Sequence, residues 1–487
     1  MSGFGSNERK TKKSEEKKIK PLQRDKLISN AFSLHSSGKI KEAADVYNFL
    51  IQKKIYDPRV FNNLGSIYSN LKQFDKAILL FDESIKKFPN SLEAYINLAN
   101  VMIIKGKSDI AKKILNKVIE LNPNYLKPYS NLAGIFVGEG NFEKAEFFLR
   151  RSLEINPKDI NTLVNLACVL KDLGNPKQAE RFLRDALEIN PKYDSALVNL
   201  GAVLNELGKI DEGEEFLKKA LKINPNSPMA LNNLGNILSK KNKNKEAELF
   251  YRKAIELKSD FFLAYDNLGS LLSKQGNLIE AEKFTQKAIN YNPKFELAYV
   301  NLGSIKIDLD KLLEAEELFL GAIQINENYS YAYRNLFRLY EKTNSIEKLK
   351  NKLKTLNENK SIINEKILFQ ARIFFREKDY IKAKKLIDQV SDEWINNTDH
   401  QTNLLYWSYK AFIEEKVGNY DEAFKCFENS QLNLKYENFN PKFFQNYIHT
   451  YRKNLDNKNF VVENNSLKGN EFSPVFLIGF PRSGTTL

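Results

Sequence analysis

The sequence predicts an all-α protein that consists mainly of stacked helix pairs, and three features of the chain lead to this fold class. An Asn recurs every 34 residues without a slip, small residues recur at two fixed places in each interval, and apolar residues fall at helical spacing in two runs per interval. Because a single helix pair cannot bury its own apolar face, neighbouring pairs should stack into one continuous core. The recurring Asn residues are Asn63, Asn97, Asn131, Asn165, Asn199, Asn233, Asn267, Asn301 and Asn335.

The small residues mark the places where the two helices of a pair should meet. Each recurring Asn is followed by Leu, and the next position is Gly or Ala in every interval except the last. A second small residue follows twelve positions later, and small residues on both helices allow their backbones to approach closely. The two sets are Gly65, Ala99, Ala133, Ala167, Gly201, Gly235, Gly269 and Gly303, and then Ala77, Ala111, Ala145, Ala179, Gly213, Ala247, Ala281 and Ala315.

Turn residues separate the predicted helices. A glycine stands in several intervals where the first helix should end, a position that favours positive φ. A proline stands near the end of many intervals, where it cannot extend the second helix. These residues are Gly106, Gly140, Gly174, Gly208 and Gly276, and Pro89, Pro123, Pro157, Pro191, Pro225 and Pro293.

The pattern closely resembles the tetratricopeptide repeat, which implies a right-handed superhelix of stacked helix pairs. The resemblance covers residues 24–437, with ten repeats over 24–363 and two further irregular repeats over 364–437. The tenth repeat is degenerate, because Phe337 and Leu349 occupy its small positions. Units are expected to begin near Arg24, Pro58, Leu92, Leu126, Ile160, Asp194, Pro228, Phe262, Glu296 and Ser330, and the two later repeats are marked by Ala371 and Ala383, and by Trp407, Ala411, Gly418 and Ala423.

The same resemblance implies that the first helix of each pair lines a concave groove that binds extended peptides. The nine recurring Asn residues would then form a row along this groove, where an amide can pair with a peptide backbone. Such a row resembles that of O-linked N-acetylglucosamine transferase. An alternative is that the Asn residues only tie neighbouring helices together. The preceding row, from Asn62 to Val300, repeats no basic residue, which argues against a groove that clamps a carboxylate.

The last fourteen residues differ from the repeats. A short apolar run from Pro474 to Ile478 predicts a buried parallel strand. It leads into Gly479, four further residues and Gly484, a spacing typical of a phosphate-binding loop, with Thr485 where such a loop has its Lys. Backbone N–H groups in such a turn favour an anion.

This segment resembles the 5′-phosphosulfate-binding loop of sulfotransferases, especially the tyrosylprotein-sulfotransferase-like group. The resemblance implies an α/β sulfotransferase domain that begins at 474–487 and uses 3′-phosphoadenosine 5′-phosphosulfate (PAPS) as sulfate donor, without a metal. The amides of Ser483, Gly484, Thr485 and Thr486 would hold the donor, and Arg482 would stabilise charge on the leaving oxygen. We expect the domain to be truncated here, and the chain by itself to be inactive.

The remaining segments and the composition set further expectations. Residues 1–23 form a basic tail that is predicted to be disordered, and 438–473 a helix around 443–455 followed by a polar linker. The net charge of +14 comes partly from that tail, so nucleic-acid binding is not expected. No stretch approaches the ~20 apolar residues that cross a membrane. Cys168 and Cys426 lie far apart as packed free thiols, which fits a cytoplasmic protein.

Two functions follow from the sequence, and a third is weaker. The first is a PAPS-dependent sulfotransferase whose repeats bind a protein or peptide acceptor and which transfers sulfate to a hydroxyl, with Tyr as the acceptor that the resemblance suggests. The alternative is a non-catalytic scaffold for protein–protein interaction. The third places a different transferase downstream, as in the glycosyltransferase arrangement.

Overall fold

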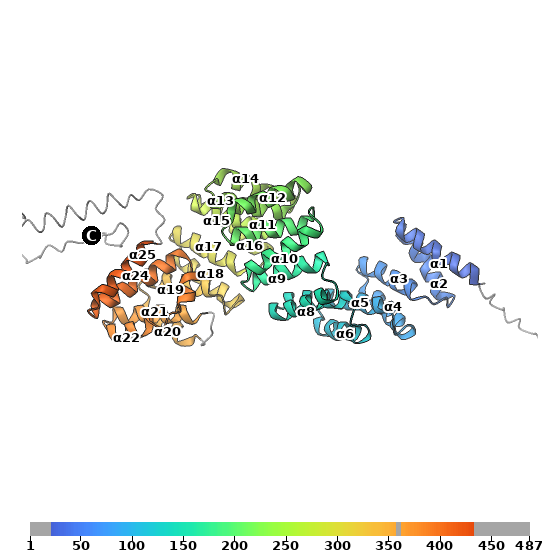
Figure 1. The fold of residues 1–487 in the computed structure, drawn as a ribbon, viewed down its shortest axis with the longest axis horizontal. Helices are drawn as coiled ribbons and strands as arrows, with labels where there is room; N and C mark the ends of the chain where they lie inside the picture. The colour runs from blue at the N-terminus through green and yellow to red at the C-terminus, as the bar shows by residue number, and fades with distance from the viewer. Residues whose placement is uncertain (1–20, 357–361, 433–487) are drawn as a thin grey trace, which may run out of the picture. The chain divides into compact units, whose positions relative to one another are not determined.

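The computed structural model describes residues 21–356 and 362–432, and every regular element in them is an α-helix (Figure 1). The chain divides into two compact units, Met1–Leu339 and Tyr340–Leu487. The boundary falls within α19, in the tenth repeat, whose small positions hold Phe337 and Leu349. Residues 1–20 of the predicted tail, the segment 438–473, and the predicted strand and loop at 474–487 lie outside the described residues, whereas residues 21–23, predicted to be disordered, form the first turn of α1.

The first unit is a solenoid of helix pairs in chain order (Figure 1). Its pairs are α1 (Pro21–Ser36) with α2 (Ile40–Gln52), α3 (Pro58–Asn70) with α4 (Phe74–Lys87), α5 (Leu92–Ile104) with α6 (Ser108–Leu121), α7 (Leu126–Gly138) with α8 (Phe142–Ile155), α9 (Ile160–Asp172) with α10 (Pro176–Ile189), α11 (Asp194–Glu206) with α12 (Ile210–Ile223), α13 (Pro228–Lys240) with α14 (Asn244–Leu257), α15 (Phe262–Lys274) with α16 (Leu278–Tyr291), and α17 (Glu296–Asp308) with α18 (Leu312–Ile325), followed by α19 (Ser330–Lys342).

The first helices from α3 to α19 begin at the residues predicted for the unit starts, while α1 begins three residues before Arg24. Local chemistry explains several of these starts. Proline occupies the first turn of α3 and α13, where its missing N–H would have no helical partner. The side chain of Asp159 accepts a hydrogen bond from the backbone N–H of Thr162 at 2.9 Å and so caps α9.

Each first helix ends in a residue with positive φ, and the predicted glycines have this conformation. At Gly106 the backbone N–H donates to Ile103 and the next N–H to Met102, the paired bonds that close a helix end. The position recurs every 34 residues even where glycine is absent, as at Lys72 (φ 59°) and Asp310 (φ 58°). The full set in the two units is Gly38, Lys72, Gly106, Gly140, Gly174, Gly208, Asn242, Gly276, Asp310, Asn344, Lys378 and Gly418.

Small residues let the two helices of a pair pack closely, as the sequence predicts. A Cβ on Gly213 of α12 would lie 2.9 Å from the carbonyl oxygen of Gly201 in α11. A Cβ on Gly235 would lie 2.6 Å from the ring of Tyr251, which is buried. Since real Cβ contacts are longer than this, only glycine fits these two helix crossings.

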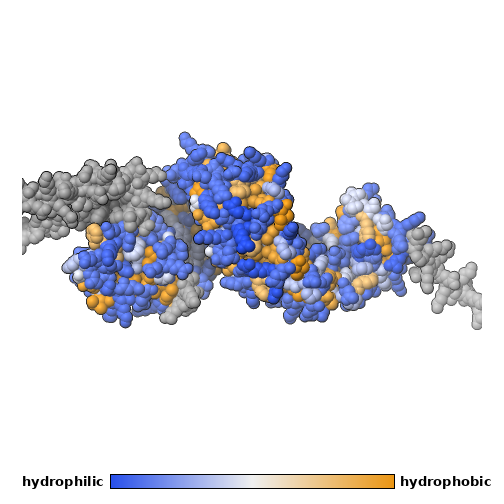
Figure 2. All heavy atoms as spheres, viewed as in Figure 1, coloured by the Kyte–Doolittle hydropathy of each residue, from blue (hydrophilic) through white to orange (hydrophobic). Residues whose placement is uncertain are grey.

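The first helices line the inner side of the solenoid. Consecutive first helices pack against each other, as α11 does against α9 and α13, while each second helix packs on the first helices of its own and the next pair. In the described part of the chain, successive second helices do not pack extensively against each other. On the face seen in Figure 2, hydrophilic residues (blue) predominate, with patches of hydrophobic residues (orange) between them.

The second unit continues the helix pairs with one insertion. Its helices are α20 (Ile346–Thr355), α21 (Ile363–Arg376), α22 (Tyr380–Ile387), α23 (Asp392–Asn397), α24 (His400–Lys416) and α25 (Tyr420–Leu432). Lys378, with positive φ, lies 34 residues after Asn344, so the first of the two later repeats keeps the regular interval. Gly418 lies 40 residues after Lys378, because the six-residue helix α23 is inserted before α24.

Candidate peptide-binding face of the first unit

The nine recurring Asn residues all lie on first helices, in the middle of α3, α5, α7, α9, α11, α13, α15, α17 and α19. Eight of them are half-buried and Asn165 is exposed. Except in α19, each Asn lies two residues before the small residue of its helix, such as Gly65 or Gly201, where consecutive first helices pack against each other. The structure therefore places the predicted row on the inner side of the solenoid.

Several of these amides tie neighbouring first helices together. Asn267 of α15 donates to the side-chain oxygen of Asn232 in α13 at 2.9 Å. Asn131 of α7 donates to Asn100 in α5 at 2.8 Å, and Asn63 of α3 donates to the hydroxyl of Tyr47 in α2, the second helix of the preceding pair, at 3.1 Å. These contacts are the helix-tying role that the sequence left open as an alternative.

Among the described residues, other members of the row form hydrogen bonds within their own helix or with a neighbour in sequence. Asn199 and Asn335 donate to the backbone carbonyls of Ser195 and Tyr331, one turn earlier. Asn233 accepts a hydrogen bond from Asn232 at 3.4 Å. In the amides that donate, the side-chain oxygen stays available as an acceptor.

Asn97 and Asn165 differ from the rest of the row. Within the described residues neither side chain makes a hydrogen bond to another part of the protein. Each therefore offers both a donor and an acceptor on the inner side of the solenoid. They belong to α5 and α9, on either side of α7.

The helices around these two amides carry an unusual inner surface. Ile104, at the end of α5, is 62% exposed, and Val137 of α7 is 39% exposed. Gly134 and Gly138 lie in helical conformation on α7 with nothing within 4 Å of the place a Cβ would occupy. Unlike Gly235, these two glycines are not required by a packing contact within the described structure. This part of the inner side is therefore apolar and lacks side chains at two positions, and it lies next to the amides of Asn97 and Asn165, which have no hydrogen-bond partner among the described residues.

The row that precedes the Asn residues is mostly buried between first helices. Asp266 of α15 is the acidic member of this row and is only 2% exposed. Its carboxylate accepts two hydrogen bonds from the amide of Asn301 in α17. Burial raises the pKa of Asp266 to about 6, and the hydrogen bond from Asn301 opposes that rise.

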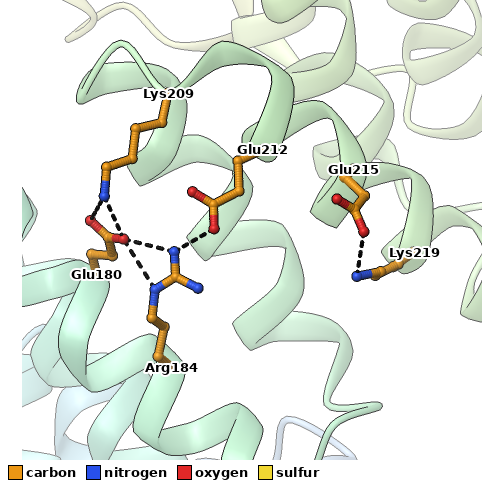
Figure 3. A network of polar contacts seen from close by, with 6 residues as sticks. All are labelled: Glu180, Arg184, Lys209, Glu212, Glu215 and Lys219. Carbon is orange, nitrogen blue, oxygen red and sulfur yellow. Dashed lines mark hydrogen bonds and ion pairs between the residues drawn. The ribbon is translucent and has the colours of Figure 1, made fainter.

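Ion pairs on the second helices fix consecutive pairs in register (Figure 3). Arg184 of α10 donates to Glu180 in its own helix at 2.8 Å and to Glu212 in α12 at 2.5 Å. Lys209, in the next pair, donates to Glu180 at 2.8 Å. The Arg184 guanidinium also lies over the ring of Phe216, 5.8 Å from its centroid. This joint was not predicted from the sequence.

The joint recurs along the chain with the period of the repeat. Arg150 contacts Glu146, Gln178 of the next pair and the ring of Phe182. Arg252 contacts Glu248, Glu280 of the next pair and the ring of Phe284. A Glu and a Phe that recur at 34 residues, with an Arg at a common register from Arg150 to Arg252 in all but the repeat of Lys218, were the signal that could have revealed it.

The remaining predicted features are the phosphate-binding loop, the two cysteines, and the expectations about metal sites and membrane spans. Arg482, Ser483, Gly484, Thr485 and Thr486 lie outside the described residues. Cys168 and Cys426 are free thiols, half-buried and buried respectively. Within 21–356 and 362–432, no cluster of His, Cys, Asp and Glu could hold a metal, and no helix has the length and hydropathy to span a membrane.

Comparisons with known proteins identify the repeats. Residues 29–264 match the family model of the cilia and flagella-associated protein 70 C-terminal domain, and residues 263–295 and 297–329 each match a tetratricopeptide-repeat model. The BBSome complex member BBS4 of Bos taurus is 34% identical over 108 residues, which is 21% of this chain and 20% of that protein. The matched stretch thus spans about a fifth of this curated relative.

Solved structures resemble parts of the chain. A tetratricopeptide-repeat protein from Parabacteroides merdae has a TM-score of 0.44 and 22% identity, over 51% of this chain and 98% of that one. YrrB, described as a TPR protein with an unusual peptide-binding site, has a TM-score of 0.32 and 24% identity, over 38% of this chain and 95% of that one. From the repeat models, the 34-residue period and the stacked helix pairs, the chain is a tetratricopeptide-repeat protein.

Proposed function

We propose that this protein is an interaction scaffold whose first unit binds an extended segment of a partner protein along its inner side. Asn97 and Asn165 carry the proposal, because in the described structure their amides serve no hydrogen bond of the protein itself. An amide that offers a donor and an acceptor pairs with the N–H and C=O groups of an extended backbone, whatever its sequence. A bound segment would satisfy both.

The bare surface of α7 supports the same site. Gly134 and Gly138 leave room for a backbone to approach closely between the two amides, and Gly134, in the interior of α7, lowers helix stability by about 1 kcal/mol relative to alanine. The exposed side chains of Ile104 and Val137 would contact apolar residues of the bound segment. We therefore propose a segment with apolar side chains and an accessible backbone.

The curated relative is named as a member of a protein complex, which favours an assembly role over an isolated enzyme. A direct test is to select ligands from a library of unstructured peptides and to map the bound peptide by hydrogen exchange. The proposal expects slower exchange in α5, α7 and α9. Protection confined to second helices, or no ligand selected by the folded protein, would contradict it.

A second candidate function rests on the segment 474–487. Its Pro481-to-Thr486 motif favours a sulfotransferase, in which Arg482 and the amides of Ser483 to Thr486 would hold PAPS while the repeats recruit the acceptor protein. Binding of adenosine 3′,5′-bisphosphate should be measured on the polypeptide as its gene encodes it. Binding that Arg482→Ala abolishes would support this function, whereas no binding by the folded protein would leave the scaffold alone.

A further inference from the structure

One column of residues recurs every 34 residues on the second helices, and we call it the coupling column. Six of its members form ion pairs with the end of the following first helix or with the turn after it, while Glu146 and Glu248 pair with an Arg of their own helix. The contacts are Lys112 with Glu139 at 2.9 Å, Glu180 with Lys209 at 2.8 Å, Glu214 with Lys241 at 2.5 Å, Glu282 with Lys306 at 2.7 Å, Lys350 with Glu377 at 2.8 Å, and Lys384 with Glu414.

An early member of the coupling column shows what an apolar residue does there. Ile78 of α4 lies 34 residues before Lys112. It is half-buried and packs against the cluster that contains Leu98 and Val101 of the next first helix, α5. The character of the column residue therefore matches that of the helix that follows: charged residues meet charged partners, and Ile78 meets apolar ones.

The last member of the coupling column is Phe424 of α25. It follows Lys384 by 40 residues, the same displacement that α23 causes at Gly418. Its side chain is 65% exposed, and Tyr420, one turn earlier on the same helix, is 70% exposed. The neighbouring Phe412 of α24 is also exposed and meets Phe427 edge to face at 5.4 Å. No helix follows α25 in the part of the chain that the structure describes.

We propose that residues 440–455 of this chain pack as a helix on the apolar face formed by Phe412, Tyr420, Phe424 and Phe427. Asn440 and Pro441 form a helix-start signal. After them, apolar residues recur at the spacing of one helix face: Phe443, Phe444, Tyr447, Ile448, Tyr451 and Leu455. Residues 433–439 connect α25 to this segment, a length within the roughly 2–8 residues usual between packed helices.

Charge favours the same occupant. The helix α25 exposes the acidic residues Asp421, Glu422 and Glu428 and one basic residue, Lys425, which lies 3.5 Å from Glu422. The segment 440–455 carries Lys442, Arg452 and Lys453 and no acidic residue. Opposite charges favour this segment and disfavour a second α25 on the same face, because two helices that each carry more acidic than basic residues would repel each other.

Hydrogen exchange on the full chain tests the proposal. We expect the backbone amides of 443–455 to exchange at least about tenfold more slowly than in the isolated peptide of the same sequence. Phe424→Ser should abolish this protection and leave the first unit unchanged, because the Phe424 side chain has little packing within the described structure. Tyr451→Ser, on the other partner, should do the same.

Ile381→Ser is the matched control, since Ile381 is 73% exposed on α22 of the same unit but lies outside the proposed face. It should leave the protection of 443–455 intact. Unprotected exchange of 443–455 in the unsubstituted chain would overturn the proposal, as would protection that survives Phe424→Ser. A dimer in light scattering that Phe424→Ser converts to a monomer, with 443–455 unprotected, would assign the face to a second copy and equally overturn it.

Discussion

Asn301 of α17 donates its side-chain amide to both carboxylate oxygens of Asp266 in α15, at 3.1 and 3.0 Å. The pair joins two consecutive first helices on the inner side of the solenoid. It also buries the Asp266 carboxylate, to which the neutral amide of Asn301 donates hydrogen bonds. The pair therefore affects both the stability of the protein and the dependence of that stability on pH.

Asp266→Asn should stabilise the protein at neutral pH. Burial raises the pKa of Asp266 from 3.8 to about 6, so the folded chain holds this proton more tightly than the unfolded chain. The stabilisation that the protonated Asp266 carboxyl provides is complete below pH 3.8 and is lost as the pH rises through 6. At pH 7.5 the loss amounts to about 3 kcal/mol. Urea denaturation should show a higher midpoint for the variant at pH 7.5 and nearly equal midpoints at about pH 3.5. A gain of the same size at both pH values would be inconsistent with this explanation.

Asn301→Ala should destabilise the protein, whereas Asn165→Ala should not. The first substitution leaves the buried Asp266 carboxylate without its donor, at a cost of about 1–3 kcal/mol. The second removes an exposed amide with no hydrogen bond in the described structure. Thermal denaturation of both variants checks this contrast, and equal losses would mean that Asn165 also has a structural role.

Two glycine substitutions should act in opposite directions. Gly235→Ala places a Cβ against the Tyr251 ring, which is buried and whose hydroxyl donates to Asn236 at 2.7 Å, so a loss of about 1–3 kcal/mol is expected. Gly134→Ala meets nothing within 4 Å and should gain about 1 kcal/mol through helix propensity. Urea denaturation midpoints provide the comparison. If Gly134→Ala also destabilised the protein, its side of α7 would have to be packed.

Arg184→Met should weaken the contact between the α9–α10 pair and the α11–α12 pair. Arg184 is partly exposed, so we expect a loss of only about 0.5–1 kcal/mol, and this loss should shrink in 1 M NaCl because exposed ion pairs are screened. Lys219→Met is the control, since Lys219 pairs with Glu215 (Figure 3) and lies over the ring of Phe216, both in its own helix α12. A loss that did not change with salt would assign the role of Arg184 to its contact with Phe216.

The sequence was sufficient to predict the helix pairs because their signals are local. Pro58 and Pro228 mark helix starts, and Gly106 and its equivalents mark helix ends, through rules that act within one turn. Lys72 and Asp310 show the limit of that reasoning. They adopt positive φ without glycine, because the helix pair around them determines the turn.

Contacts between repeats were harder to predict because they depend on stacking. Arg184 contacts Glu212 and Phe216, which lie in the next helix pair and come close to it only when the two pairs stack. The Asn row was predicted, but the division of labour within it was not: Asn267 ties helices, while Asn97 and Asn165 do not. The short helix α23 was also unforeseen, although it accounts for the irregular last repeat.

The central claim is that the inner side of the first unit binds an extended peptide through Asn97 and Asn165. Its most direct test is the dissociation constant of a selected peptide for the unsubstituted protein and for the double variant Asn97→Ala/Asn165→Ala, with Asn116→Ala, an exposed amide on the second helix α6, as control. Two lost backbone hydrogen bonds at about 1 kcal/mol each predict roughly 30-fold weaker binding for the double variant. The control should bind as the unsubstituted protein does. Unchanged affinity of a folded double variant would contradict the claim.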